Sequence, residues 1–209
     1  DYQDAFLKLK EDTTCKSYAP VITKKKEKKK EFKLTYNKKE MKLTSNGTRP
    51  MGGDDKCGIA IALQIAKETS IPMKILFTVQ EETGCNGVKN VVEKNPEFLS
   101  DVIYSITIDR KYGNELLISS ASVRNCSNLF AGELAKWGII TGIPIKLENG
   151  GLADVCILRD CNMEAVNISA GYYEPHRNSE YIKFSEVLLI KDWVKNFMLH
   201  SLYRSDINE

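Results

Sequence analysis

Residues 52–84 read GGDDKCGIAIALQIAKETSIPMKILFTVQEETG, and this stretch contains the pattern that decides the fold. An acidic motif at residues 54–55 stands just before an Ala- and Ile-rich run of helical length, residues 59–67, which predicts a largely buried helix. The short, partly β-branched apolar run at residues 73–79 predicts a buried strand. A second acidic motif at residues 81–82 follows that strand directly. Helices and strands that alternate in this way indicate an α/β protein.

The same alternation continues toward the C-terminus. Residues 102–108 (VIYSITI) and 165–168 predict two further strands of the central sheet. Residues 128–137 predict a helix that stops at Gly138, and Ser185 is a candidate N-cap for a last helix that runs to about residue 199. The expected fold is therefore a mixed, mostly parallel central β-sheet that is flanked by helices.

The composition changes near residue 50. Before it the chain is Lys-dense, with KKKEKKK at residues 24–30 as the extreme. Apolar and polar residues alternate at residues 32–36 and again at 41–43, which predicts a Lys-rich N-terminal β-ribbon. We therefore divide the chain into a Lys-rich N-terminal segment, residues 1–50, and a domain at residues 51–209.

Composition excludes several classes of protein. The chain has 209 residues, 42% of them hydrophobic, so it can bury a core and is not disordered as a whole. Its 30 Lys+Arg are balanced by 28 Asp+Glu, which argues against a surface built wholly for binding nucleic acid. No apolar run has the length of a membrane span, and no signal peptide opens the sequence. The 6 cysteines are scattered without paired spacing, which favours reduced thiols and a cytoplasmic location.

The acidic motifs fall at corresponding places in this architecture. Asp109 directly follows the predicted strand at residues 102–108, and His176 lies in the loop after the strand at residues 165–168. Ligands of open α/β sheets gather beyond the carboxyl ends of the strands, so these groups are expected to share one crevice with the two earlier acidic motifs. Carboxylates crowded in this way repel one another unless cations hold them. With imidazole present, Zn²⁺, Mn²⁺ and Co²⁺ all suit the site.

Four motifs together resemble a known group of enzymes: GGDDKCGIAIAL, FTVQEETGCNG, ITIDRKYG and NISAGYYEPHRNSEYI. They are similar to the di-zinc exopeptidase clan of aminopeptidases, tripeptidases and aminoacylases. More narrowly, they look like small bacterial and phage zinc-peptidase-like proteins that carry a GDDKCGI motif. The resemblance covers roughly residues 50–190. It implies a zinc-exopeptidase-like fold, two Zn²⁺ ions, and hydrolysis of a peptide or acyl-amide bond in a small substrate.

The resemblance also implies roles for five residues. Asp54 would bridge the two metals, Glu82 and His176 would complete one of them, and Asp109 would bind the other. Glu81 would be the general base that takes a proton from the bridging water and passes it to the leaving amine. The expected function is thus that of an aminopeptidase- or dipeptidase-like metallohydrolase.

Other residues near these motifs have less specific interpretations. Tyr172 and Tyr173 are candidates to donate a hydroxyl to an oxyanion, or else pack in the loop. Arg110 is a candidate to bind an acidic substrate group, or else to pair with a neighbouring carboxylate. Asp154 is interpreted first as a helix N-cap and second as a support for the site.

One element of the clan pattern is missing. The clan has a second ligand histidine in an H-x-D motif upstream of the bridging Asp, whereas the histidines of this chain, His176 and His200, both lie downstream. A start at Asp1 fits a truncated N-terminal part, and we favour this explanation over loss of the ligand by degeneration. In either case we expect impaired or no activity. The alternative function is a non-catalytic module that kept the peptidase fold and binds a metal or a partner.

The remaining hypothesis is that the lysines of residues 24–30 bind nucleic acid. A run of lysines is more simply a solvated loop, so we expect no nucleic-acid partner and no membrane partner. The sequence leaves the substrate, the native metal and the oligomeric state open.

Overall fold

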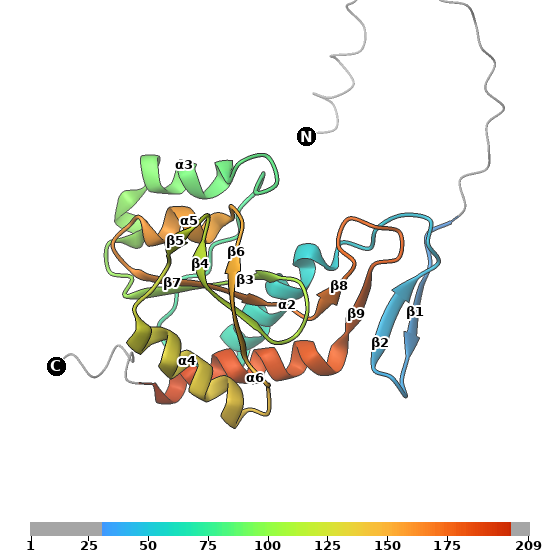
Figure 1. Ribbon diagram of the computed structural model, residues 1–209. Coiled ribbons are helices and arrows are strands. Elements are labelled where there is room, and N and C mark those ends of the chain that lie inside the picture. The colour runs from blue at the N-terminus through green and yellow to red at the C-terminus, as the bar shows by residue number, and fades with distance from the viewer. Residues whose placement is uncertain (1–30, 202–209) are drawn as a thin grey trace, which may run out of the picture. The chain divides into compact units, whose positions relative to one another are not determined.

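A computed structural model describes residues 31–201, so the Lys run at 24–30 and its predicted role lie outside the described residues. A central sheet organises this part of the chain (Figure 1). Its strands are β3 (Tyr104–Arg110), β4 (Glu115–Ser120), β5 (Val123–Arg124), β6 (Lys146–Gly150) and β7 (Glu164–Ser169). The order is β3-β7-β4-β5, with β6 also paired to β4. The β3–β7 and β4–β6 pairs are parallel and contain most of the paired residues, so the sheet is mixed and largely parallel.

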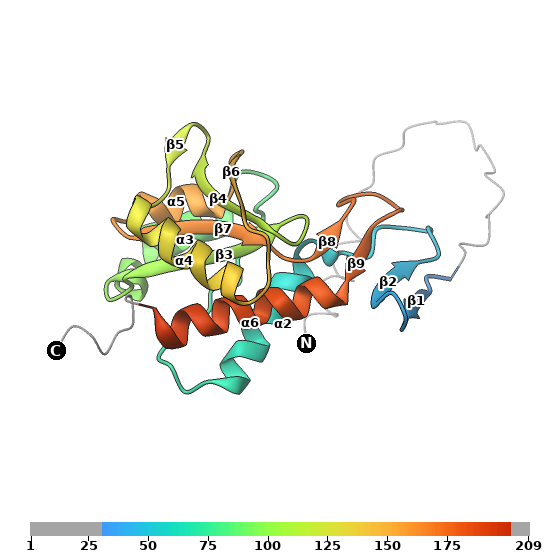
Figure 2. The same cartoon turned by 60° about the horizontal axis from the view of Figure 1, so that its bottom comes forward.

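Helices cover both faces of this sheet, as Figures 1 and 2 show. One layer consists of α2 (Gly53–Glu68), α4 (Asn128–Ile140) and α6 (Phe184–His200), in which α6 contacts both of the others. The other layer consists of α3 (Asn86–Lys94), the 3₁₀ helix η1 (Pro96–Leu99) and α5 (Asp154–Arg159). Here α5 contacts β3 and β7, and α3 contacts α5. The predicted α/β architecture is therefore present.

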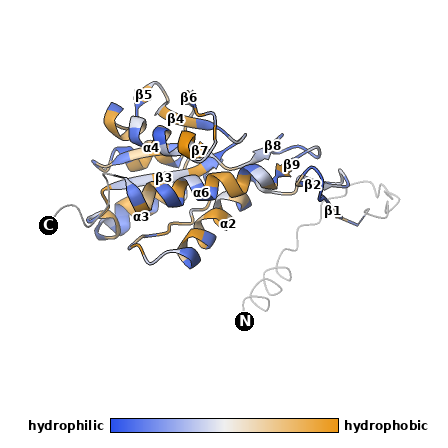
Figure 3. Ribbon diagram, turned by 90° about the horizontal axis from the view of Figure 1, so that it is seen from below, coloured by the Kyte–Doolittle hydropathy of each residue, from blue (hydrophilic) through white to orange (hydrophobic). Residues whose placement is uncertain are grey.

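A small antiparallel sheet is joined to the central one. It contains β1 (Leu34–Asn37), β2 (Lys42–Ser45), β9 (Tyr181–Lys183) and β8 (Tyr172–Tyr173), in that order. The strands β1 and β2 form the two-stranded ribbon expected from residues 32–43. Its strands are exposed or half-buried and mostly hydrophilic (Figure 3). Because β2 also pairs with β9, the ribbon is connected to the C-terminal half of the chain.

The main core lies between the sheet and the α2–α4–α6 layer. Phe130 of α4 and Phe197 of α6 are fully buried and meet edge-on, with 5.5 Å between ring centroids. Trp193 is also fully buried, and its indole N–H donates to the Leu134 carbonyl at 2.7 Å. This bond satisfies the one polar atom of a large apolar side chain. No helix among residues 31–201 is long and apolar enough to cross a membrane.

Two predicted helix ends were wrong. The helix α4 does not stop at Gly138 but continues to Ile140, and the chain turns at Gly142 with φ +94°. Gly138 is needed for another reason: a Cβ there would collide with Ile145 and stand 3.0 Å from Trp193. Ser185 is not the N-cap of α6, because the helix begins at Phe184 and Ser185 lies in its first turn.

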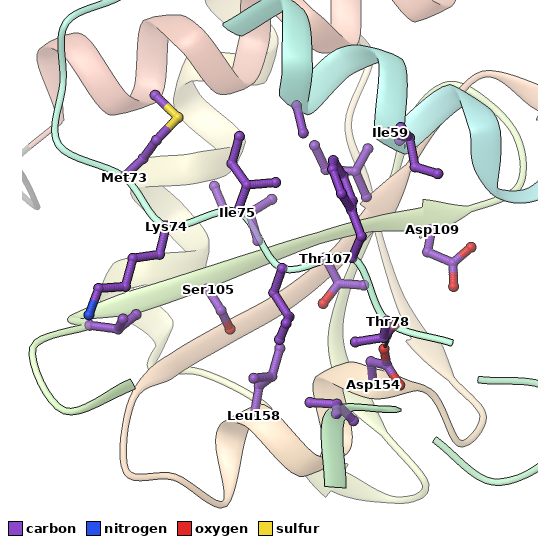
Figure 4. A pocket seen from close by; sticks show the side chains of 18 of the residues that line it. Ile59, Met73, Lys74, Ile75, Thr78, Ser105, Thr107, Asp109, Asp154 and Leu158 are labelled. Carbon is purple, nitrogen blue, oxygen red and sulfur yellow. Dashed lines mark hydrogen bonds between the residues drawn. The ribbon is translucent and has the colours of Figure 1, made fainter. Parts of the chain in front are cut away.

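Residues 73–79 do not form the predicted strand. They are extended, but they belong to neither sheet, and Phe77 and Val79 are 51% and 69% exposed. A cavity of about 840 Å³ lies between this segment and the edge of β3, where hydrogen bonds between two paired strands would otherwise form. Residues 71–78, β3 and α2 line this cavity (Figure 4). Apolar patterning therefore predicted neither the partial exposure of this segment nor its lack of a strand partner.

The same cavity changes the burial of α2. Ile61 and Ile65 are buried against the core, whereas Ile59 lines the cavity and is 40% exposed. Leu63 is 46% exposed on the opposite side from the core. The helix therefore buries one face, and the prediction of a largely buried helix was wrong.

Gly58 sets the approach of α2 to β3. A Cβ at Gly58 would collide with the Ile108 carbonyl oxygen and the Asp55 carboxylate. We expect Gly58→Ala to lower the free energy of unfolding by about 1–3 kcal/mol, because the helix must move away from the strand.

Gly132→Ala is the matched control, because nothing lies within 4 Å of the added methyl group on α4. It should raise the free energy of unfolding by about 0.5–1 kcal/mol through helix propensity. Urea denaturation of both variants measures the contrast, and equal effects would contradict this description of the α2–β3 contact.

Candidate metal centre

Asp54 is placed by the irregular start of α2. Gly52 has φ +72°, which a glycine adopts without a steric penalty, and Asp54 itself has non-helical backbone angles. The Asp54–Asp55 peptide bond is cis. The Asp54 side chain is 18% exposed, at the end of the helix nearest to the β3 carboxyl end.

Glu81 and Glu82 lie in a turn between the extended segment and α3. The Glu81 carbonyl accepts hydrogen bonds from the amides of Gly84 at 2.9 Å and Cys85 at 2.8 Å, which closes the turn. Three residues before Glu81 in the chain, the Thr78 hydroxyl donates to the Asp154 carboxylate (Figure 4). The two glutamates are therefore held by a loop that α5 anchors.

Asp109 lies inside β3, one residue before the strand ends. Its amide donates to Asn167 Oδ1 on the neighbouring strand β7 at 3.3 Å. The Tyr172 hydroxyl donates to Asp109 Oδ1 at 3.5 Å, a long contact. Tyr172 is 3% exposed, so this hydroxyl faces the carboxylate from within the core.

His176 reaches the acidic groups from the loop between β8 and β9. It adopts φ +61°, and its Nε2 lies 3.1 Å from Asp54 Oδ2 and 3.1 Å from Glu82 Oε1. One ligand atom from each of these three residues lies within 4.8 Å of the others. Residues 54, 82 and 176, far apart in the chain, thus present two carboxylates and an imidazole at one point.

These groups share a pocket of about 280 Å³. Its lining contains all five residues to which the sequence analysis assigned a role: Asp54, Glu81, Glu82, Asp109 and His176. The carboxyl ends of β3 and β7, the start of α2 and two loops therefore meet at one place, as expected for an open α/β sheet.

The carboxyl groups in and beside the pocket have raised pKa values. Burial, and then the charges of Asp55, Asp54 and Glu81, together raise the pKa of Asp109 to about 9. Burial, and then the Asp54 charge, raise the pKa of Asp55 to about 8, against a lowering bond from the Gly58 amide. The pKa of Glu81 is raised by burial and by Glu82. Carboxylates in this condition are stabilised by a cation among them.

The donor chemistry fits a divalent metal. Asp54, Glu82 and His176 offer two oxygens and one imidazole nitrogen, a set that suits Zn²⁺, Mn²⁺ or Co²⁺. On the Asp109 side the pocket offers carboxylates without an imidazole, since the other histidine, His200, is stacked on Trp137 at 5.4 Å between ring centroids. The residues therefore fit one metal well and a second one incompletely.

The three candidate substrate-binding residues have different surroundings. Tyr172 and Arg110 line the pocket, but Arg110 Nε donates to Glu115 at 2.7 Å. The Tyr173 hydroxyl donates to Glu186 at 2.6 Å and does not line the pocket.

Sequence reasoning missed or misplaced three polar residues around the pocket. Asn167 and Glu180 are each 2% exposed, and nothing in their immediate sequence marked them. Asp154 is not the N-cap of α5, because Ala153 occupies that position. Instead, Asp154 holds Thr78, which agrees with its second interpretation as a support.

Comparisons with known proteins support the fold. No family model and no curated protein sequence matches this chain. Solved structures match well: the aminopeptidase PepT from Bacillus cereus has a TM-score of 0.66 at 14% identity, covering 78% of this chain and 74% of that one. A tripeptidase from Staphylococcus aureus has a TM-score of 0.62 at 16% identity, with the same coverage.

A TET aminopeptidase from a marine sediment thaumarchaeote has a TM-score of 0.62 at 14% identity. It aligns with 84% of this chain but with only 54% of its own length. The class of fold is therefore that of aminopeptidases and tripeptidases. At these identities the likeness establishes the fold alone.

The candidate metal site predicts unequal roles for the two histidines. We expect His176→Ala to weaken Zn²⁺ binding about tenfold or more, because it removes the imidazole from the three-residue group. His200→Ala is the control, since that ring lies against Trp137, and it should bind Zn²⁺ like the wild type. Competition against a chromogenic chelator measures both affinities. Equal losses in the two variants would exclude this site.

Proposed function

We propose that the protein is a metal-dependent hydrolase of peptide or acyl-amide bonds in small substrates, of the aminopeptidase or dipeptidase type. One observation carries the proposal: Asp54, Glu81, Glu82, Asp109 and His176 line one pocket of about 280 Å³. Asp54, Glu82 and His176 would hold a divalent metal, and Asp109 with Asp54 would contribute to a second site. The peptidase fold of the structural neighbours supports a peptide substrate.

Glu81 is the proposed general base. A bound divalent cation would polarise the substrate carbonyl and lower the pKa of water. The Glu81 carboxylate lines the pocket without being one of the three clustered ligands, so it is free to accept a proton. It would take this proton from the attacking water and pass it to the leaving amine nitrogen. Its raised pKa suits a base that must accept a proton and then release it.

Tyr172 would orient the acidic cluster rather than exchange a proton. Burial, with Asp109 as the next cause, raises the pKa of its hydroxyl, which stays protonated and donates toward Asp109. The hydroxyl thereby fixes one oxygen of that carboxylate.

The general base and the metal ligand should be separable by mutation. Glu81→Gln is expected to reduce the rate of hydrolysis by about 10²–10⁴-fold while metal affinity stays unchanged, because general-base catalysis alone is removed. The neighbouring Glu82→Gln is expected to weaken metal binding. A panel of unblocked di- and tripeptides, assayed with Zn²⁺, Mn²⁺ and Co²⁺ in a chain extended by its upstream residues, provides the measurement.

The same assay addresses the alternative function. A chain extended by its upstream residues that binds metal but hydrolyses none of these peptides would favour a non-catalytic module. Unchanged hydrolysis by Glu81→Gln would eliminate the proposed mechanism.

A second metal would need an imidazole beside Asp109, and the free edge of β3 indicates where it would be placed. Within the described residues β3 is paired only with β7, and the cavity of about 840 Å³ lies along its other edge. A strand in this cavity, parallel to β3, would end beside Asp54 and Asp109, which both line it. We propose that a segment outside residues 31–201 supplies this strand and, at its end, the missing imidazole. The 209-residue sequence contains no histidine other than His176 and His200, so in this proposal the ligand would come from outside it.

Metal stoichiometry tests this part. We expect the 209-residue chain to bind about one Zn²⁺ and a chain extended by its upstream residues to bind about two, since the extension adds an imidazole beside Asp109. Elemental analysis after dialysis gives the count. The same count for both chains would contradict the proposed strand.

A further inference from the structure

Glu180 is a buried carboxylate that binds the backbone at the start of α2. It lies directly before β9 and is 2% exposed. Its Oε2 accepts from the amides of Met51 and Gly52, each at 2.7 Å. Its Oε1 accepts from the amide of Asp54 at 3.2 Å. One side chain therefore contacts three of the four residues from 51 to 54.

The surroundings fit this carboxylate closely. A Cβ at Gly53 would stand 3.1 Å from Glu180 Oε1 and 3.0 Å from Tyr172 Cβ, so a larger residue there would have to push these groups aside. The Lys56 ammonium donates to the Met51 carbonyl at 2.9 Å and holds the same loop from its other side. An ionised carboxylate only accepts hydrogen bonds, and here it meets backbone donors.

Glu180 also belongs to the loop that carries His176. The two residues are separated by Arg177, Asn178 and Ser179, and the Glu180 amide donates to the Arg177 carbonyl at 3.1 Å. The loop therefore places His176 Nε2 against Asp54 Oδ2, at 3.1 Å, while its last residue holds the Asp54 amide. The side chain and the backbone of Asp54 are thus fixed by the same short segment.

We propose that Glu180 is a positioning residue that sets the distance between Asp54 and His176 in the metal site. This inference rests on the proposed function. Without Glu180, the Met51–Asp54 loop would lose three hydrogen bonds, and Asp54 would no longer be held opposite the imidazole. Outer partners that orient ligands in this way strengthen metal binding without touching the metal.

Three variants of the full chain test the proposal by Co²⁺ titration, followed by the visible absorption of the bound ion. Glu180→Gln keeps the size but points an NH₂ group at backbone donors, and it should weaken Co²⁺ binding by about 10–100-fold. Glu180→Asp restores both oxygens on a shorter stem and should recover part of the affinity. Glu174→Gln is the control, because Glu174 is in the same loop but pairs with Arg177 at 3.1 Å on the surface.

Each outcome has a separate meaning. Wild-type affinity and spectrum in Glu180→Gln would overturn the positioning role. Absence of Co²⁺ binding in the wild type would instead overturn the proposed metal site. Equal weakening in Glu174→Gln would show a general effect of the loop, which also overturns the inference.

Amide hydrogen exchange covers the case in which Glu180→Gln does not fold. In the unaltered chain the amides of Met51 and Gly52 should exchange slowly, since Glu180 accepts from both. Exchange as fast as that of the exposed Gly151 amide would show that these bonds do not form, and would refute the proposal without any metal present.

Discussion

Mutual repulsion among carboxylates is the constraint on which this structure depends. Asp54, Asp55 and Asp109 are brought together where α2 meets the end of β3, and burial raises the pKa of both Asp55 and Asp109. A fold that tolerates such crowding must hold its backbone firmly from outside the cluster. Three contacts hold the backbone in this way: the Gly58 contact with β3, the Thr78–Asp154 hydrogen bond and the hydrogen bonds of the Glu180 carboxylate. Each one fixes a segment that carries an acidic residue without adding a positive charge.

Much of the site could be predicted from the sequence because its residues stand at element ends. Asp109 and His176 each follow an apolar run, and sheet topology then determines where those runs finish. Local pattern was also sufficient for the β1–β2 ribbon, whose alternation and polar turn are contained in a dozen residues. For these features, short-range information and one general rule of α/β architecture were enough.

Other features depend on partners that the sequence does not reveal. The apolar run at residues 73–79 indicates a segment of low polarity, but a strand also needs a neighbouring backbone at hydrogen-bonding distance, which this segment does not have. Gly138 resembles a helix stop until the bulk of Trp193 and Ile145 on its other side is known. Glutamate is usually a surface residue, and only the folded chain shows that Glu180 is buried against α2. In each case the deciding contact is distant in sequence.

The unpaired edge of β3 has a practical consequence for handling the protein. Phe77, which is 51% exposed, lines the cavity along this edge, and the nearby Ser105 and Thr107 hydroxyls are buried without hydrogen-bond partners. An open strand edge next to apolar surface is a template on which a second molecule adds its own strand. As long as no strand occupies this edge, we expect it to be the place where two molecules of the chain associate at high concentration.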